Sequence, residues 1–238
     1  MNSLNSHSAY NPLNSTDPSQ LNAVHGAEIK VRRAAQSSEL EVLTDIYRED
    51  TNIAVWQRQL SETLKSSVDA FTASNPTFQT SMTLTPESAL AAVKDALGDS
   101  AQLELSENIA ELVDMFCCLF ELKRAGLRLA TLDRAMCPRF HVDRIPCRLV
   151  TTFQGIATEW LPHEVVNREK LGAGNNGMPD STSGVYKSQN DIQRISSGDV
   201  ALLKGELWQG NEGTGLVHRS PQVPAGESRL LLTLDFSD

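Results

Sequence analysis

The sequence predicts a mixed α+β fold, with helices in the N-terminal half and short antiparallel strands in the C-terminal half. Before position 126, apolar residues recur at three- and four-residue steps, which is typical of amphipathic helices. After it, short apolar runs are divided by Gly, Pro and Asn, as in β sandwiches and barrels. The chain of 238 residues is long enough for one substantial core, so we expect a single domain over residues 37–238.

The N-terminal region divides into a tail and a cap. Residues 1–36 are rich in Asn, Ser and Pro and lack periodic hydrophobicity, so they are expected to form a flexible tail. Residues 37–126 are predicted to be a mainly helical cap. Its first part, 38–60, contains a helix-like apolar turn and then a short strand-like run. Helices are predicted at 61–73 and from Pro86, because proline is favoured in the first helical turn.

The clearest helix is predicted for residues 106–125. Apolar side chains recur along it at helical spacing, Ser106 is placed to cap its start, and Gly126 is placed to end it. A single apolar face of this kind suits a helix that covers one face of a sheet. We therefore expect a structural role for it.

The β core is predicted for residues 127–238. Within it, the interval 172–184 is rich in Gly and Asn and is expected to be a loop, and a candidate for a lid or insertion. The runs that predict strands are 127–132, 139–143, 148–153, 157–161, 199–203, 216–219 and 229–236.

Composition excludes several functional classes. The chain carries 21 basic and 30 acidic residues, a formal charge of -9, which argues against a nucleic-acid-binding surface. No apolar run is long enough to span a membrane, and the N-terminus lacks the pattern of a secretory signal. The four cysteines form no C-x-x-C pair and are expected to be reduced thiols. We therefore expect a cytoplasmic protein.

Two histidines and an aspartate form a candidate metal site. His141 and Asp143 are two positions apart, so on a regular strand they point to the same side and can grip one ion. His218 is the strongest candidate for a third ligand. Two imidazoles and one carboxylate with open positions are the ligands of a mononuclear iron(II) site. The alternative is that all three are ordinary polar residues at strand ends, with Asp143 paired to Arg144 or Arg148.

The order H-x-D, a long gap, His, ten residues and Arg resembles the iron(II)- and 2-oxoglutarate-dependent oxygenases. The resemblance implies a double-stranded β-helix of the jelly-roll or cupin-like kind, with the triad binding iron(II). It also implies that Arg229 binds the distal carboxylate of 2-oxoglutarate, a role that suits the planar guanidinium. The hydroxyl residue often found two positions after that arginine is here Leu231, although Thr233 shares its strand face. The alternative for Arg229 is a surface pair with Glu227 or Asp235.

A second resemblance covers most of the chain. It is to an uncharacterised bacterial family, domain of unknown function 1826, from which no established reaction can be transferred. Its members are often encoded beside zinc-homeostasis genes, so the resemblance implies a context of metal homeostasis. The segments that carry it are 52–56, 137–143, 158–161, 202–206, 210–213 and 218–221.

Cys137 leaves the type of metal open. If its thiolate joined the triad, the site would have four protein ligands and would be typical of closed zinc sites. The interpretation that we favour is that Pro138 breaks the strand and that Cys137 is a packed thiol. Further side chains are placed to contact a substrate or orient the ligands, although each can equally be a solvated or core residue. They are Arg139, Arg148, Thr151, Lys204, Glu206 and Trp208.

Three functional hypotheses follow. The first is a mononuclear non-haem iron(II)- and 2-oxoglutarate-dependent oxygenase with an unknown small-molecule or protein substrate. The second is a non-catalytic zinc-binding protein in metal storage, sensing or delivery. The third is a cupin-like binder of small molecules that has lost its metal. The sequence specifies neither the substrate nor the oligomeric state.

Overall fold

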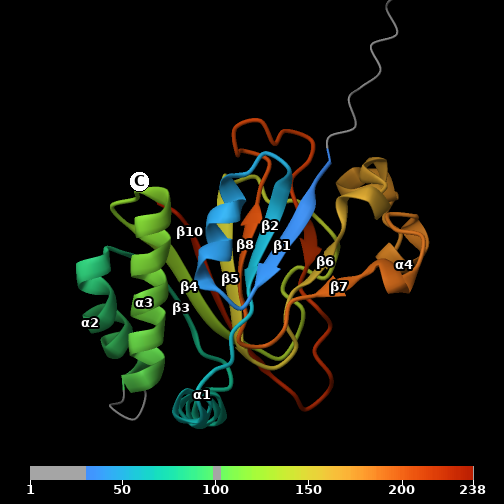
Figure 1. The fold of residues 1–238 in the computed structure, drawn as a ribbon. Coiled ribbons are helices and arrows are strands. Elements are labelled where there is room, and N and C mark those ends of the chain that lie inside the picture. The colour runs from blue at the N-terminus through green and yellow to red at the C-terminus, as the bar shows by residue number, and fades with distance from the viewer. Residues whose placement is uncertain (1–30, 99–102, 238) are drawn as a thin grey trace, which may run out of the picture.

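The computed structural model describes residues 31–98 and 103–237, which form two sheets and a group of helices (Figure 1). The prediction of a flexible tail for residues 1–30 lies outside this part. The strands are β1 (Arg33–Ser37), β2 (Thr51–Trp56), β3 (Gln79–Leu84), β4 (Ala125–Leu132), β5 (Cys147–Gln154), β6 (Glu159–Leu161), β7 (Gln193–Arg194), β8 (Val200–Lys204), β9 (Val217–Arg219) and β10 (Arg229–Phe236). The α-helices are α1 (Glu62–Ser74), α2 (Pro86–Leu97), α3 (Leu103–Phe120) and α4 (Asp180–Ser183).

The two sheets face each other. The larger has seven strands in the order β1-β2-β8-β5-β10-β4-β3, and the smaller has three in the order β7-β6-β9. His141 extends the small sheet through an isolated antiparallel bridge to His218 of β9. From β4 onward the chain passes repeatedly between the two sheets, and β6 and β7 are consecutive strands of the small one. The prediction of a mixed α+β fold is confirmed.

Helices cover the outer face of the large sheet. α1 contacts β5 and α3 contacts β4, and Phe71 and Phe116 are buried in the apolar core between these layers. The sequence begins α1 and α2 with local caps: the hydroxyls of Ser61 and Thr85 accept hydrogen bonds from the backbone N–H groups three residues on. The predicted start of α1, and of α2 at Pro86, is confirmed.

α3 differs from its prediction at both ends. Among the described residues it begins at Leu103, so Ser106 is a buried residue inside the helix and not its cap. It ends at Phe120, and Glu121 then adopts a left-handed conformation with φ 54°. Gly126 lies within β4 because the chain turns almost directly from the helix into that strand.

A second core fills the space between the sheets, and a third lies on the outer face of the small sheet. Trp160 and Leu231 belong to the second, and Phe140, Tyr186 and Val217 to the third. The layers are therefore helices, large sheet, small sheet and the segment that contains α4, as Figure 1 shows. No helix within the described residues is long and apolar enough to cross a membrane.

Three sequence expectations need correction. Residues 33–37, assigned mostly to the tail, form the edge strand β1, which pairs in parallel with β2 through backbone hydrogen bonds that need no apolar pattern. The segment 37–126 is not purely a cap, because β2 and β3 join the large sheet. Residues 139–143 form no regular strand, and only His141 bridges to the small sheet. Pro138 and Pro146 flank this segment and cannot donate to a ladder.

The core against the helices should dominate stability. Phe116 is 0% exposed and its ring contacts Phe120 and Phe236 edge-on. Phe116→Ala is expected to lower the free energy of unfolding by about 3–5 kcal/mol, because it removes buried apolar surface and leaves a cavity. Urea unfolding followed by circular dichroism measures this. Leu90→Ala, at an exposed position of α2, is the control, and an equal loss in both variants would contradict the placement of the core.

Candidate metal centre

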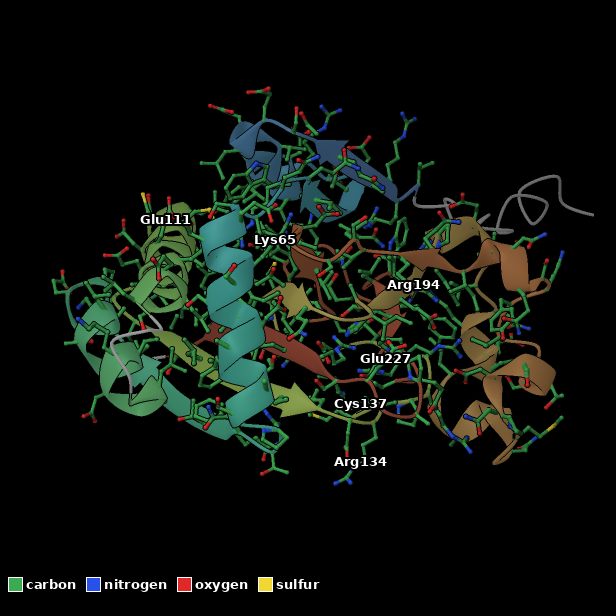
Figure 2. All side chains as sticks on the ribbon, turned by 90° about the horizontal axis from the view of Figure 1, so that it is seen from below. Lys65, Glu111, Arg134, Cys137, Arg194 and Glu227 are labelled. Carbon is green, nitrogen blue, oxygen red and sulfur yellow. The ribbon has the colours of Figure 1, made fainter. Side chains whose placement is uncertain are left out.

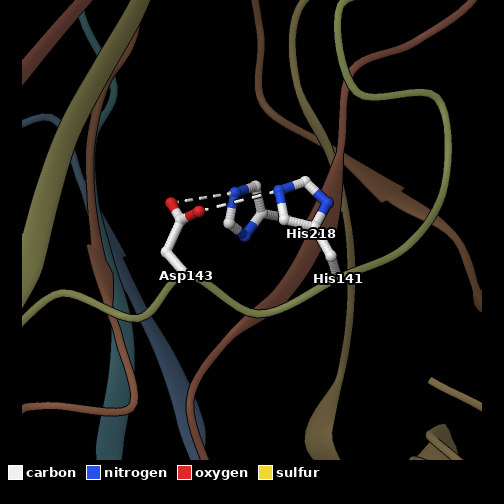
Figure 3. A group of neighbouring side chains, drawn as sticks. All are labelled: His141, Asp143 and His218. Atoms are coloured by element: carbon white, nitrogen blue, oxygen red, sulfur yellow. Dashed lines mark ion pairs between the residues drawn. The ribbon is translucent and has the colours of Figure 1, made fainter. Parts of the chain in front are cut away.

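His141, Asp143 and His218 converge on one point, as Figure 3 shows. Their ligand atoms all lie within 4.8 Å of one another. Nε2 of His141 is 3.6 Å from Oδ1 of Asp143, and Nε2 of His218 is 3.4 Å from Oδ2. An ion with bonds of about 2.1 Å holds neighbouring ligands roughly 3–3.5 Å apart, so little adjustment is needed to bind one.

Backbone pairing places the two imidazoles. The N–H of His141 donates to the carbonyl of His218 and the reverse bond is also made, both at 3.0 Å. Directly opposed residues in an antiparallel pair project to the same side, and the ring centroids lie 4.6 Å apart. On the other side of β9, His218 is opposite Trp160 of β6. The histidine pair is therefore a continuation of the small sheet.

Each imidazole is held in the tautomer that suits a metal ligand. Nδ1–H of His141 donates to the carbonyl of Arg139 at 2.9 Å, and Nδ1–H of His218 donates to that of Leu216 at 3.3 Å. A carbonyl oxygen only accepts, so the lone pair of each neutral ring lies on Nε2. Burial and the neighbouring His218 lower the pKa of His141, which favours its neutral form. Two lone pairs and a carboxylate thus face one point, which a cation would stabilise.

Arg148 keeps the carboxylate in place. Its Nη1 donates to Oδ2 of Asp143 at 2.7 Å, while Nε and Nη2 donate to the two oxygens of Asp235, both at 2.8 Å. Arg148 in β5 and Asp235 in β10 are directly opposed in the large sheet. Burial alone would raise the pKa of Asp143, but His218, Arg148 and His141 lower it to about 2. Asp143 is therefore charged at neutral pH.

Arg229 is a buried cation without a carboxylate partner among the described residues. Its side chain is 0% exposed, and burial lowers its pKa to about 10. Its two terminal nitrogens donate only to hydroxyls, of Ser220 at 3.3 Å and of Thr152 at 3.2 Å, and Nε has no partner in the described chain. Arg229 lines the same cavity as His141 and His218. Neither Glu227 nor Asp235 pairs with it, so the surface-pair alternative is wrong.

Cys137 does not join the cluster. Among the described residues, the donor atoms that meet at this point come only from the triad. Cys137 is exposed, so it is not the packed thiol that we favoured, and its carbonyl accepts from the N–H of Ser220. It lies near the end of β4 with Arg134, whose side chain projects away from the molecule (Figure 2). The cavity beside the triad nevertheless includes Cys137 in its lining.

The other candidate residues fall into two groups. Arg148 contacts the triad directly, while Arg139 contributes its carbonyl and its side chain donates to the carbonyl of Gly177. Glu206 accepts from the backbone N–H groups of Gly213 and Gly215, on the approach to His218. These three support the site from its surroundings.

The large sheet has one face toward the triad and one toward the helices. Three candidate residues lie on the helix side, namely Thr151, Lys204 and Trp208. Along β5 and β8, alternate residues face the helices. Thr151 pairs across the strands with Val200, and Lys204 pairs with Cys147, and both of these partners belong to the core against the helices. Nζ of Lys204 donates to the carbonyl of Arg48 and lies 4.9 Å from the ring centroid of Trp208. The hydroxyl that reaches Arg229 is that of Thr152, one position along.

A second ion-pair network was missed in the sequence. Arg219 donates to Glu159 at 2.8 Å and to Asp180 at 2.9 Å, and Oδ2 of Asp180 accepts from the N–H of Phe140. It joins β9, β6 and α4 to the residue before His141. The partners are far apart in the chain and share no spacing, so no sequence signal identifies them.

Comparison with known proteins gives the family of the chain. The model of the family described as "Protein of unknown function (DUF1826)" matches residues 37–235. The chain belongs to this family. No curated protein matches the sequence.

Solved structures of 2-oxoglutarate and iron(II) oxygenases resemble the DUF1826 chain at low identity. The dioxygenase for auxin oxidation 1 from Arabidopsis thaliana, in complex with 2-oxoglutarate, has 12% identity and a TM-score of 0.46, over 87% of this chain and 92% of that one. The rice dioxygenase for auxin oxidation has 13% identity and a TM-score of 0.48, over 85% and 82%. A Pseudomonas putida prolyl-4-hydroxylase has 13% identity and a TM-score of 0.38, over 83% and 98%. At this similarity, the likeness gives no role to any residue.

The placement of Lys204 predicts a pH effect on stability. Burial, with a contribution from Arg32, lowers the pKa of Lys204 to about 8, and its side chain is 2% exposed. Between this value and the ordinary lysine pKa, the unfolded chain binds more protons than the folded one, so this residue makes stability rise with pH. The free energy of unfolding of the native protein, compared with that of Lys204→Met, should increase by about 1–3 kcal/mol when the pH is raised from about 7 to about 10.5. Urea unfolding at both pH values tests this, with Lys94→Met as the control at an exposed position. If the difference in unfolding free energy between the native protein and Lys204→Met is the same at both pH values, the prediction is contradicted.

Proposed function

We propose that this protein is a mononuclear non-haem iron(II)- and 2-oxoglutarate-dependent oxygenase with an unknown substrate. One observation carries the proposal: the Nε2 lone pairs of two fixed imidazoles and an ionised carboxylate converge beside a buried, carboxylate-free arginine in one cavity. A cation site next to an anion site suits a ligand that coordinates the metal at one end and carries a carboxylate at the other. 2-Oxoglutarate has this form.

The donor set favours an open iron site over a closed zinc site. Structural zinc sites use four protein ligands, and the described residues bring together three, with Cys137 outside the group. Two imidazoles and one carboxylate leave positions free for a co-substrate and dioxygen. The non-catalytic zinc protein and the binder without a metal are therefore the weaker hypotheses, because the donor set is complete and open.

Each residue has a role in this proposal. His141, Asp143 and His218 would hold iron(II), which supplies the redox chemistry that activates dioxygen. Arg229 would bind the distal carboxylate of 2-oxoglutarate through its guanidinium. Leu231 stands where the oxygenase pattern often has a hydroxyl. The hydroxyls of Ser220, just after β9, and of Thr152 in β5 contact the guanidinium and would support the same carboxylate site.

Anaerobic titration of metal-free protein tests the proposal. Iron(II) followed by 2-oxoglutarate should produce a visible charge-transfer band. Arg229→Gln should retain iron(II) but weaken 2-oxoglutarate binding about 10- to 100-fold, because a charge-assisted bidentate contact is lost. His218→Ala should lose iron binding, and Arg134→Gln, at an exposed position, should change neither. Tight zinc binding that requires Cys137, without any response to 2-oxoglutarate, would contradict the proposal.

Arg148 should tune metal affinity without touching the metal. Arg148→Gln removes the hydrogen bond that orients Asp143, and loss of such a support typically weakens metal binding about 10- to 100-fold. Competition with a chromophoric chelator measures the affinity. Arg128→Gln, at an exposed position of β4, is the matched control. Equal affinity in both variants would show that Asp143 needs no support from Arg148.

A further inference from the structure

A second cavity lies outside the candidate metal centre. Its volume is about 510 Å³, which suits a small organic ligand. None of the triad residues lines it, and it opens between β1 and β2 of the large sheet and the β6 and β7 side of the small one. Its lining is Val31, Arg32, Arg33, Ala34, Gln36, Asn52, Trp160, Pro162, His163, Glu164 and Gln193.

The charge of this lining is opposite to that of the whole chain. The protein has a formal charge of -9, yet Arg32 and Arg33 line the cavity against a single carboxylate, that of Glu164. Arg33 is largely exposed and lies 3.6 Å from Asp50, so it is partly neutralised. The excess positive charge at the cavity therefore comes mainly from Arg32.

Arg32 is a buried cation without an ionic partner among the described residues. It is 7% exposed, and its nitrogens donate to neutral oxygens: the side-chain carbonyl of Asn211 and the backbone carbonyls of Val31 and Gly210. It makes no ion pair with any described carboxylate. Burial of a cation without a counter-charge is costly, so an anion in the adjacent cavity would be favoured.

His163 adds a hydrogen-bond donor, the Nε2–H group of its ring. Nη2 of Arg168 lies 3.3 Å from Nδ1 of His163, and because a guanidinium only donates, Nδ1 must accept and the proton of the neutral ring must lie on Nε2. Arg168 adds positive charge behind the histidine, and its buried Nε has no partner in the described chain. Nη1 of Arg168 lies 3.7 Å from Oε1 of Glu206.

The rest of the lining is suited to an organic group. Val31, Ala34, Pro162 and Trp160 contribute apolar surface, and the amides of Gln36 and Gln193 add polar groups. We propose that this cavity is a binding site for a small organic anion, with the anionic group held by Arg32 and His163 and the remainder against Trp160. The site is separate from the metal centre, although Trp160 is directly opposite His218 in the small sheet.

Binding can be tested on the full-length, metal-free protein without iron(II) or 2-oxoglutarate, so the outcome does not depend on the proposed function. Calorimetric titration with citrate and with adenosine monophosphate distinguishes a carboxylate from a phosphate as the anionic group, and adenosine is the neutral control. At least one anion should bind and adenosine should not. If neither anion binds at millimolar concentration, the proposal is overturned.

Two matched pairs of variants locate the binding. Gln193→Glu adds a negative charge to the lining without a change of shape and should weaken binding about tenfold or more, whereas Gln79→Glu, exposed on the distant strand β3, should not. Trp160→Phe should abolish the ligand-induced change in tryptophan fluorescence, and Trp208→Phe should retain it. Arg32→Gln should also weaken binding, but it is buried, so Gln193→Glu decides the result. Equal affinity in the two Gln→Glu variants would overturn the site.

Discussion

The backbone bridge between His141 and His218 is the interaction on which the candidate site depends. The segment between β4 and β5 contains no regular strand, so these two hydrogen bonds of 3.0 Å attach it to the small sheet. Strand-like alternation around the bridge directs Phe140 into the outer core, while the ring of His141 meets the ring of His218 and the carboxylate of Asp143. Asp180 reinforces the attachment by accepting from the N–H of Phe140. The bridge between His141 and His218 has only two backbone hydrogen bonds, and it is stabilised because apolar packing and a buried ion pair hold the same few residues.

Two arginines lie beside the triad, and their hydrogen-bond partners suit different roles: one supports Asp143, and the other is free to bind a ligand. Arg148 donates to two carboxylates and is electrostatically satisfied within the protein, so its role is to hold Asp143. Arg229 is more deeply buried, yet it meets only hydroxyls and leaves one nitrogen without a partner in the described chain. Since an unpaired buried charge is costly, the protein retains it at the expense of stability. Such a cost is expected where the missing partner is a ligand.

The sequence predicted those features that depend on local pattern or on the order of ligands. The bounds of β10 and the starts of α1 and α2 follow from period and capping residues. The prediction of the two histidines and Asp143 depended on the H-x-D spacing together with the order of the downstream histidine and arginine. The errors have physical causes. β1 is an edge strand held by backbone pairing, so its composition is that of a tail. Thr151 and Lys204 were predicted either to contact a substrate or to be core or solvated residues, and the phase of strand alternation, which composition does not reveal, turns them toward the helices.

The segment between β6 and β7 connects both candidate binding sites. Near its start, His163 lines the cavity beside Arg32, and Arg168 contacts His163. Further along, Asp180 is bound to Arg219 and to the N–H of Phe140, and Tyr186 packs edge-on against Phe140 with ring centroids 5.7 Å apart. The glycine-rich stretch 172–184, predicted as a lid or insertion, contains Asp180, and Val185 and Tyr186 of the outer apolar core follow it directly. Through these contacts the segment between β6 and β7 holds the residue before His141 in place, so the geometry of the candidate metal ligands depends on a segment that contributes none of them.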